Sequence, residues 1–189
     1  MNRPSKTKLA LAIVFGGAIF GLFSYITVDE VIHHTSDVEF CGSCHSMGPI
    51  AKSYAKDVHG GANKYGTVAQ CVDCHLPHDS SINYLFVKTK LGIHDVWTEF
   101  VVGPEDVPWV EKRKRVTEFT YDSGCMKCHA KLERATMGSN KAFVAHKPYF
   151  QKETPKTCTS CHEHVGHEQL GAYLHSAGVA KINNGPKGE

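Results

Sequence analysis

The longest apolar run of the sequence lies close to its N-terminus. Residues 9–28 are mostly apolar and carry no charged side chain. As an α-helix, this run extends about 30 Å, which is the thickness of the hydrocarbon core of a bilayer. The pattern therefore predicts a transmembrane anchor at residues 9–28, preceded by a short tail at residues 1–8.

The charges on either side of this run predict its orientation. Arg3, Lys6 and Lys8 precede it, whereas no Lys or Arg follows it before Lys52. Basic residues favour the cytoplasmic side of a membrane. We therefore expect a single-pass protein of the bacterial inner membrane, with a cytoplasmic N-terminus and a periplasmic domain. A cleaved signal peptide is the alternative, although its apolar region is usually shorter and no A-x-A cleavage site follows this one.

A second periodic segment spans residues 82–100. Its apolar residues recur at helical spacing, at Ile82, Phe86, Ile93, Trp97 and Phe100. On such a helix Lys88 and Asp95 lie along one line, about 10.5 Å apart and opposite the apolar stripe. Spacing alone is also consistent with two solvated charges on an exposed face.

Composition excludes two classes of protein. The chain has 189 residues, of which 41% are hydrophobic, so it is too apolar for an intrinsically disordered protein. Its 21 basic and 19 acidic residues leave a net charge of +2. A nucleic-acid-binding protein needs a stronger positive field.

All eight cysteines form C-x-x-C pairs, and a histidine directly follows each pair. Random placement of the 8 Cys and 13 His would give about 0.02 such matches. The four sites consist of Cys41, Cys44 and His45; Cys71, Cys74 and His75; Cys125, Cys128 and His129; and Cys158, Cys161 and His162. This is the attachment sequence of c-type haem, whose vinyl groups bond to the thiols while the histidine approaches the iron. The sequence therefore predicts four covalently bound haems.

Two other uses of paired cysteines explain the pattern less well. A zinc site accounts for the spacing but not for the histidine after every pair, and a disulfide scaffold accounts for neither. About 160 residues outside the membrane would surround four haems, which is too little chain for a large side-chain core. We therefore expect a mainly α fold with short helices and much irregular loop, in which the haems form the core.

An internal repeat suggests second iron ligands. The first two motifs start 30 residues apart and the last two 33 residues apart. His59 and His146 follow the first motif of each pair at similar distances, and His78 and His167 follow the second. The two halves therefore resemble copies of one dihaem unit. Met47 is a further candidate, because it lies two residues after His45, although a methionine often only fills a core.

The combined pattern resembles the NapC/NirT/NrfH family of membrane-anchored multihaem quinol dehydrogenases. The resemblance covers nearly the whole chain. It rests on the anchor, the four motifs, the C-x-x-C-H-x-M start, and the phrases Val58-His59-Gly60-Gly61, Cys74-His75-Leu76-Pro77-His78 and Cys161-His162-(x)4-His167. It predicts a transmembrane helix followed by a multihaem cytochrome c domain built from two dihaem repeats.

The resemblance also implies roles for individual residues. Met47, rather than His45, would be the proximal ligand of a high-spin first haem, which is open to quinol. The other three haems would have His75, His129 and His162 as proximal ligands and His59, His146 and His167 as distal ligands, with the role of His78 less certain. Lys88 would bind a quinol oxygen and Asp95 would accept a proton, with His94 as a further candidate.

The implied function is electron transfer from the membrane quinol pool. The protein would be a quinol dehydrogenase that oxidises menaquinol or ubiquinol at haem 1. It would then pass electrons to a periplasmic nitrate, nitrite, N-oxide or S-oxide reductase in anaerobic respiration. The main alternative is a terminal reductase that reduces a small nitrogen or sulfur oxide at the open haem 1. A third hypothesis is a passive electron reservoir.

Domain boundaries follow from these elements. We expect the anchor at 9–28, a first dihaem half with the quinol-site helix at 29–110, a second dihaem half at 111–175, and a flexible tail at 176–189. Gly17 and Gly21 form a G-x-x-x-G pattern in the anchor, which could pair two copies as a homodimer.

Overall fold

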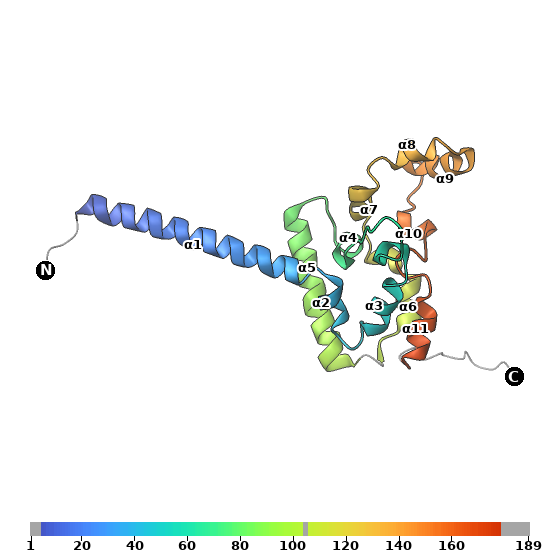
Figure 1. Ribbon diagram of the computed structural model, residues 1–189, viewed down its shortest axis with the longest axis horizontal. Coiled ribbons are helices and arrows are strands. Elements are labelled where there is room, and N and C mark those ends of the chain that lie inside the picture. Colours follow the sequence, from blue (N-terminus) through green and yellow to red (C-terminus); the bar gives the residue numbers. More distant parts are fainter. Residues whose placement is uncertain (1–4, 104–105, 179–189) are drawn as a thin grey trace.

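A computed structural model describes residues 5–103 and 106–178, and the regular structure in these ranges is entirely helical. One long helix projects from a cluster of much shorter helices joined by irregular loops (Figure 1). This confirms the prediction of a mainly α fold. The predicted tail at 176–189 lies almost wholly outside the described ranges, and so does half of the predicted segment 1–8.

The long helix, α1 (Lys6–His34), contains the predicted anchor. The side chain of Ser5 caps its start, and none of its residues is buried. By length and composition, α1 is able to cross a membrane. It continues six residues beyond the predicted end at 28, because no proline or glycine interrupts the polar turns that follow. Gly17 and Gly21 lie on its exposed surface, and the pairing of two anchors there stays a prediction.

The remaining helices form the domain. They are α2 (Val38–Gly42), α3 (Gly48–Tyr54), η1 (Val58–Gly60), α4 (Cys71–His75), α5 (Ser81–Trp97), η2 (Thr98–Val102), α6 (Trp109–Lys114), η4 (Val116–Glu118), α7 (Asp122–Cys128), α8 (Leu132–Thr136), α9 (Asn140–Phe150), α10 (Cys158–Cys161) and α11 (Leu170–Ser176). The helix predicted at 82–100 is therefore present as α5 followed by η2, a π-helical turn.

The apolar core that the chain builds from its own side chains is small. In the described ranges, the buried apolar residues include Tyr54, Leu76, Pro77, Val107 and Leu174. The accessible surface is 14228 Å², whereas a compact monomer of this mass exposes about 9000 Å². Part of the excess belongs to the projecting α1. The scarcity of buried apolar residues agrees with the expectation that prosthetic groups complete the core.

The motif helices rest directly on one another across the predicted boundary between the halves. A Cβ atom on Gly124 of α7 would lie 1.9 Å from the carbonyl oxygen of Asp73 in α4, so this close approach requires glycine. Lys127 and Asp73 form an ion pair of 3.1 Å across the same contact. Asp122 accepts a hydrogen bond of 2.9 Å from the backbone N–H of Cys158. The second, third and fourth motifs are therefore joined into one unit.

The predicted boundary at 110/111 falls inside α6 rather than in a loop. This helix begins at Trp109, directly after Pro108, which stands at its N-cap. A proline lacks the N–H needed inside a helix, so a helix readily starts after it. The two halves are therefore joined by a helical segment.

Candidate haem and quinol site

Three of the four motif histidines each face a second histidine at nearly the same separation. The ring centroids of His59 and His129 are 6.3 Å apart, those of His75 and His167 are 6.4 Å apart, and those of His146 and His162 are 6.1 Å apart. An imidazole nitrogen binds a metal at about 2 Å, and the ring centre lies about 1 Å further back, so two imidazoles on one iron have centroids about 6 Å apart. The spacing in each pair fits one iron between the rings.

The paired rings come from different elements. His75 ends α4, while His129 and His162 directly follow α7 and α10. Their partners lie on η1, on α9 and in the loop before α11. The pairs His59–His129 and His75–His167 each join the first half of the chain to the second. The predicted halves therefore share their candidate iron sites.

The cysteines follow one another in space in the order of the motifs. The thiol of Cys41 interacts with that of Cys71, and the thiol of Cys125 interacts with that of Cys158. Between these two pairs, Cys74 interacts electrostatically with Cys125. The eight thiols and three facing imidazole pairs form a donor set that suits covalent haem at four neighbouring sites.

Burial favours the neutral imidazole at the second motif. It lowers the pKa of His75, and it lowers the pKa of His167 to about 4. Nδ1 of His75 donates to the carbonyl oxygen of Phe119 at 2.9 Å, and Nδ1 of His146 donates to that of Ala142 at 2.8 Å. When Nδ1–H of a neutral ring is hydrogen-bonded, Nε2 is left free to bind a metal.

His59 has a different partner, the buried carboxylate of Asp57. This carboxylate accepts hydrogen bonds from the backbone N–H of His59 at 2.9 Å and from its Nδ1 at 3.2 Å. Only 6% of Asp57 is exposed. A carboxylate behind a ligating imidazole fixes the ring and makes it a stronger donor to the metal. The sequence analysis missed Asp57, although its position two residues before a candidate ligand was a usable signal.

The first motif is built differently. His45 is exposed and faces no other histidine of the described chain, whereas Met47 is half-buried at the start of α3. Glu99 of η2 accepts hydrogen bonds from the backbone N–H of His45 at 2.6 Å and from the hydroxyl of Ser46 at 2.5 Å. The Ser46 hydroxyl and the two neighbouring N–H groups hold the pKa of Glu99 below its usual range.

Glu99 therefore fixes the turn that leads to Met47. Sequence reasoning missed this residue. It follows Asp95 by four positions and so lies on the same side of the helical segment as Lys88 and Asp95. An acidic residue on the inner side of a predicted helix was the available signal.

Lys88 and Asp95 lie between the end of α1 and the first motif. Nζ of Lys88 donates to the carbonyl oxygen of Thr35 and to the hydroxyl of Ser36, both at 2.9 Å. Burial lowers the pKa of Lys88, against an opposing effect of Cys41. Both Lys88 and Asp95 interact electrostatically with the thiol of Cys41. The structure thus brings these two predicted residues to the first motif.

The two lower-ranked histidines lie apart from the facing pairs. His94 is exposed, and its Nδ1 is 3.3 Å from the carboxylate of Asp95. Nε2 of His78 donates to the carbonyl oxygen of Val72 at 3.1 Å, and its ring packs on Tyr84. Since one ring in each pair has Nδ1 hydrogen-bonded and so presents Nε2, this bond of His78 disfavours it as an iron ligand.

Several known proteins are similar to this chain in sequence. Residues 3–172 match the family described as NapC/NirT cytochrome c family, N-terminal region. The tetraheme c-type cytochrome CymA of Shewanella oneidensis is 32% identical over 178 residues, which are 87% of this chain and 94% of CymA. The cytochrome c nitrite reductase subunit NrfH of Nitratidesulfovibrio vulgaris is 28% identical over 171 residues, which are 89% of each chain.

A solved structure is also similar. The crystal structure of the cytochrome c nitrite reductase NrfHA complex bound to the HQNO inhibitor matches with a TM-score of 0.53 and 29% identity. The match covers 82% of this chain and 90% of that chain. The family match at residues 3–172 therefore includes both the anchor and the four cysteine motifs.

Replacing Asp57 by Asn should raise the midpoint potential of a single haem. The amide no longer strengthens His59 as a donor to oxidised iron, so we expect a shift on the order of 50 mV, equivalent to about a tenfold change in the redox equilibrium. Potentiometric titration followed by absorbance and EPR measures it. Glu153→Gln, at an exposed position, is the control. Four unshifted potentials in Asp57→Asn would contradict a role for this carboxylate.

Replacing Glu99 by Ala should alter the optical and EPR signature of the haem at the first motif and leave the other three unchanged. The backbone N–H groups of residues 45 and 46 lose their acceptor, so the turn before Met47 relaxes. Glu99→Gln keeps an acceptor oxygen and should restore most of the signature. If Glu99→Ala has the wild-type spectrum at the first haem, Glu99 does not position this turn.

Proposed function

The chain belongs to the NapC/NirT cytochrome c family, and on this premise we propose that it oxidises membrane quinol and delivers the electrons to a periplasmic reductase. One observation carries the proposal. The end of an apolar helix able to cross a membrane, a partly buried lysine and the first haem motif meet at one place. A lipid-soluble reductant would reach a redox centre there without leaving the membrane surface.

The cysteines of the four motifs would hold haem covalently, and the facing histidines would supply axial ligands. The assignment is His75 with His167, His129 with His59, and His162 with His146. It is supported by the centroid separations of 6.1–6.4 Å. When bound, haem supplies one-electron redox chemistry, which suits a two-electron donor oxidised in single steps.

Met47 is the proposed ligand at the first site. A thioether binds iron more weakly than an imidazole and raises the reduction potential. Its position supports the proposal, because the Glu99-bound turn leads into Met47 while leaving the ring of His45 exposed. The iron at the site nearest to Lys88 would then lack the strong imidazole ligand that His45 could otherwise supply.

Lys88 would orient the quinol. A lysine ammonium group has three donor hydrogens, and Thr35 and Ser36 accept two of those of Lys88. The third remains to donate to a quinol oxygen. Because the two protein bonds fix Nζ, the lysine side chain loses little further freedom when quinol binds.

Asp95 would accept a proton that the quinol releases. Its carboxylate is 53% exposed and contacts His94. An exposed carboxylate can exchange the proton with water on the outer side of the membrane. Quinol oxidation releases two protons with two electrons, so a proton acceptor beside the ring favours the reaction.

The acceptor of the electrons would be a separate periplasmic reductase. NrfH is described as a subunit of cytochrome c nitrite reductase, and the similar solved structure is an NrfHA complex. These relatives support a chain that works with a partner enzyme. Nitrate, nitrite, N-oxide and S-oxide reductases are the candidate partner classes.

Stopped-flow reduction by a menaquinol analogue in liposomes tests the function. We expect haem reduction by the quinol without added mediator. The alternative, a terminal reductase of a small nitrogen or sulfur oxide, is favoured by His45, which is exposed and faces no second histidine of the described chain. That alternative predicts haems that stay oxidised with quinol, together with turnover of nitrite by the dithionite-reduced protein.

Lys88→Ala or Asp95→Ala should slow quinol oxidation about tenfold or more, because a charge-assisted hydrogen bond or the proton acceptor is lost. Haem content should remain four per chain by pyridine haemochrome assay. Lys90→Ala, an exposed lysine of the same helix, is the matched control. Wild-type rates in both variants would remove this site from the proposal.

Intact-mass measurement should find four covalent haems, and Met47→Ala should change the optical and EPR signature of only one. The change is expected because the first iron loses its thioether ligand. His45→Ala in parallel provides the comparison. A wild-type spectrum in Met47→Ala, with a changed one in His45→Ala, would return the ligand role to His45.

A further inference from the structure

The apolar stripe of α5 points away from the domain. Its five members are between 60% and 83% exposed: Ile82, Phe86, Ile93, Trp97 and Phe100. The opposite face carries Lys88 and, on the following turn, Glu99, and both bond to other parts of the chain. Asp95 lies on the same side and is 53% exposed. A surface helix of a soluble domain normally has the reverse arrangement, with apolar residues inward.

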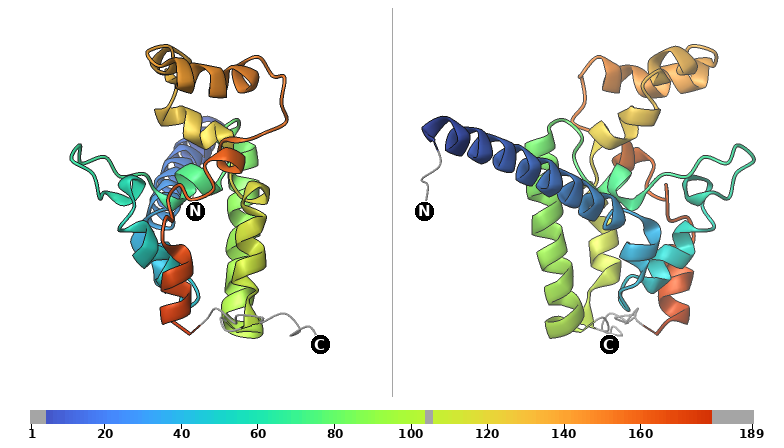
Figure 2. Two further views of the ribbon diagram at one scale, coloured as in Figure 1. Left: turned by 90° about the vertical axis from the view of Figure 1, so that its right-hand side faces the viewer. Right: turned by 60° about the vertical axis from the view of Figure 1, so that its left-hand side comes forward.

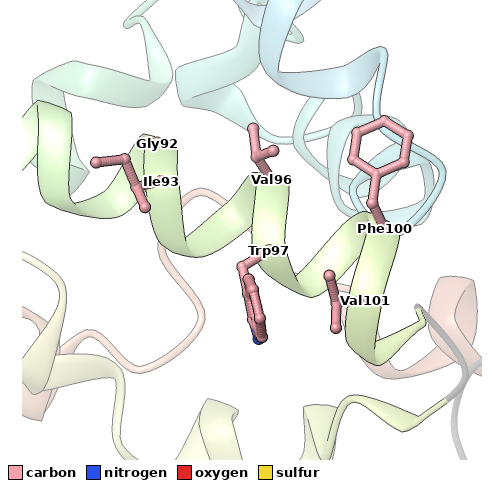
Figure 3. A pocket seen from close by; sticks show the side chains of 6 residues that line it. All are labelled: Gly92, Ile93, Val96, Trp97, Phe100 and Val101. Carbon is pink, nitrogen blue, oxygen red and sulfur yellow. The ribbon is translucent and has the colours of Figure 1, made fainter.

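The exposed stripe widens into a continuous apolar surface at the end of α5. Figure 3 shows Ile93, Val96, Trp97, Phe100 and Val101 around a shallow depression. Within the described ranges, no charged side chain lines it. Large contiguous apolar surfaces on a folded protein mark contacts with another apolar phase.

The position of α5 relative to α1 identifies the apolar phase that this surface contacts. α5 runs across the end of α1 and forms the side of the domain nearest to it, with α3, α6 and α11 on the far side (Figures 1 and 2). The bonds from Lys88 to Thr35 and Ser36 fix this crossing. A helix placed across a membrane-spanning helix lies along the membrane plane.

The length of α1 gives the height of α5 above the bilayer. From Val28 to Thr35 the helix rises about 10 Å. The polar region on each side of a bilayer is about 5–7 Å thick, and a helix with its side chains has a radius of about 5–6 Å. The outer face of α5 therefore reaches the headgroup layer.

We propose that the outer face of α5 is embedded in the headgroup and upper acyl region of the bilayer that α1 crosses. The occupant of the apolar surface is phospholipid. Trp97 suits this boundary, since its ring is apolar with one polar edge. The inference rests on the membrane anchoring in the proposed function, but not on quinol chemistry.

A second copy of the chain or a reductase would fit this face less well. Either partner would have to occupy the side of the domain nearest to α1, where the headgroup layer lies. The charged face of α5 already contacts other parts of the same chain, through Lys88 and Glu99. The Lys88 contact, which holds α5 beside the end of α1, favours lipid.

The test uses the full-length haem-loaded protein in nanodiscs of phosphatidylethanolamine and phosphatidylglycerol that contain a diazirine-bearing acyl chain. After illumination, proteolysis and mass spectrometry locate the lipid adducts. We expect adducts on α1 and on residues 82–101, and none on α9. Phe86→Glu should lower the adduct yield on residues 82–101 about threefold or more. Val144→Glu, on α9, should not change it; Phe86 and Val144 are equally exposed, at 69% and 68%.

The outcomes separate this inference from the proposed function. Adducts on α1 without adducts on residues 82–101 would overturn the inference while leaving the anchor intact. A dimer by native mass, with residues 82–101 free of lipid adducts, would assign the face to a second copy and also overturn it. Absence of adducts on α1 would instead remove the membrane anchoring on which both rest.

Discussion

The domain depends on imidazole pairs that join distant parts of the chain. His59 and His129 are 70 residues apart in the sequence, and His75 and His167 are 92 residues apart. Closing loops of about 100 residues by a cross-link removes about 4–5 kcal/mol of unfolded-chain entropy. Few apolar side chains are buried to offset the ordering of these loops. Metal ligation across the pairs would supply the missing constraint, so we expect cofactor attachment and folding to be coupled.

The sequence predicted features whose signals are local. The four C-x-x-C-H motifs, the anchor and the amphipathic helix at 82–100 are each readable within a short window. The repeat also indicated His59, His146, His78 and His167 as candidates. It did not indicate their partners, because that choice depends on the close packing of α4 on α7 at Gly124 and on long-range contacts that no local pattern encodes.

Other features that could not be predicted from the sequence have a related cause. Periodicity revealed that α5 has an apolar stripe, but a stripe has the same period whether it faces a core or a lipid. The direction became clear only when Lys88 and Glu99 were seen to bind backbone groups far away in sequence. Asp57 was missed for a different reason. Its carboxylate has a functional role only if the neighbouring ring of His59 is a ligand.

In the proposed function, an amphipathic helix with its charged face inward would solve a problem specific to quinol oxidation. The substrate is soluble in lipid, whereas its protons must leave into water. On α5 an apolar surface and the side chains of Lys88 and Asp95 lie within the thickness of one helix, about 10 Å. In the proposed function, a quinol ring would need only to move past this helix to exchange lipid for a lysine and a carboxylate. Asp95 keeps about half of its surface exposed, which gives the proton a route outward without opening the lipid-facing side.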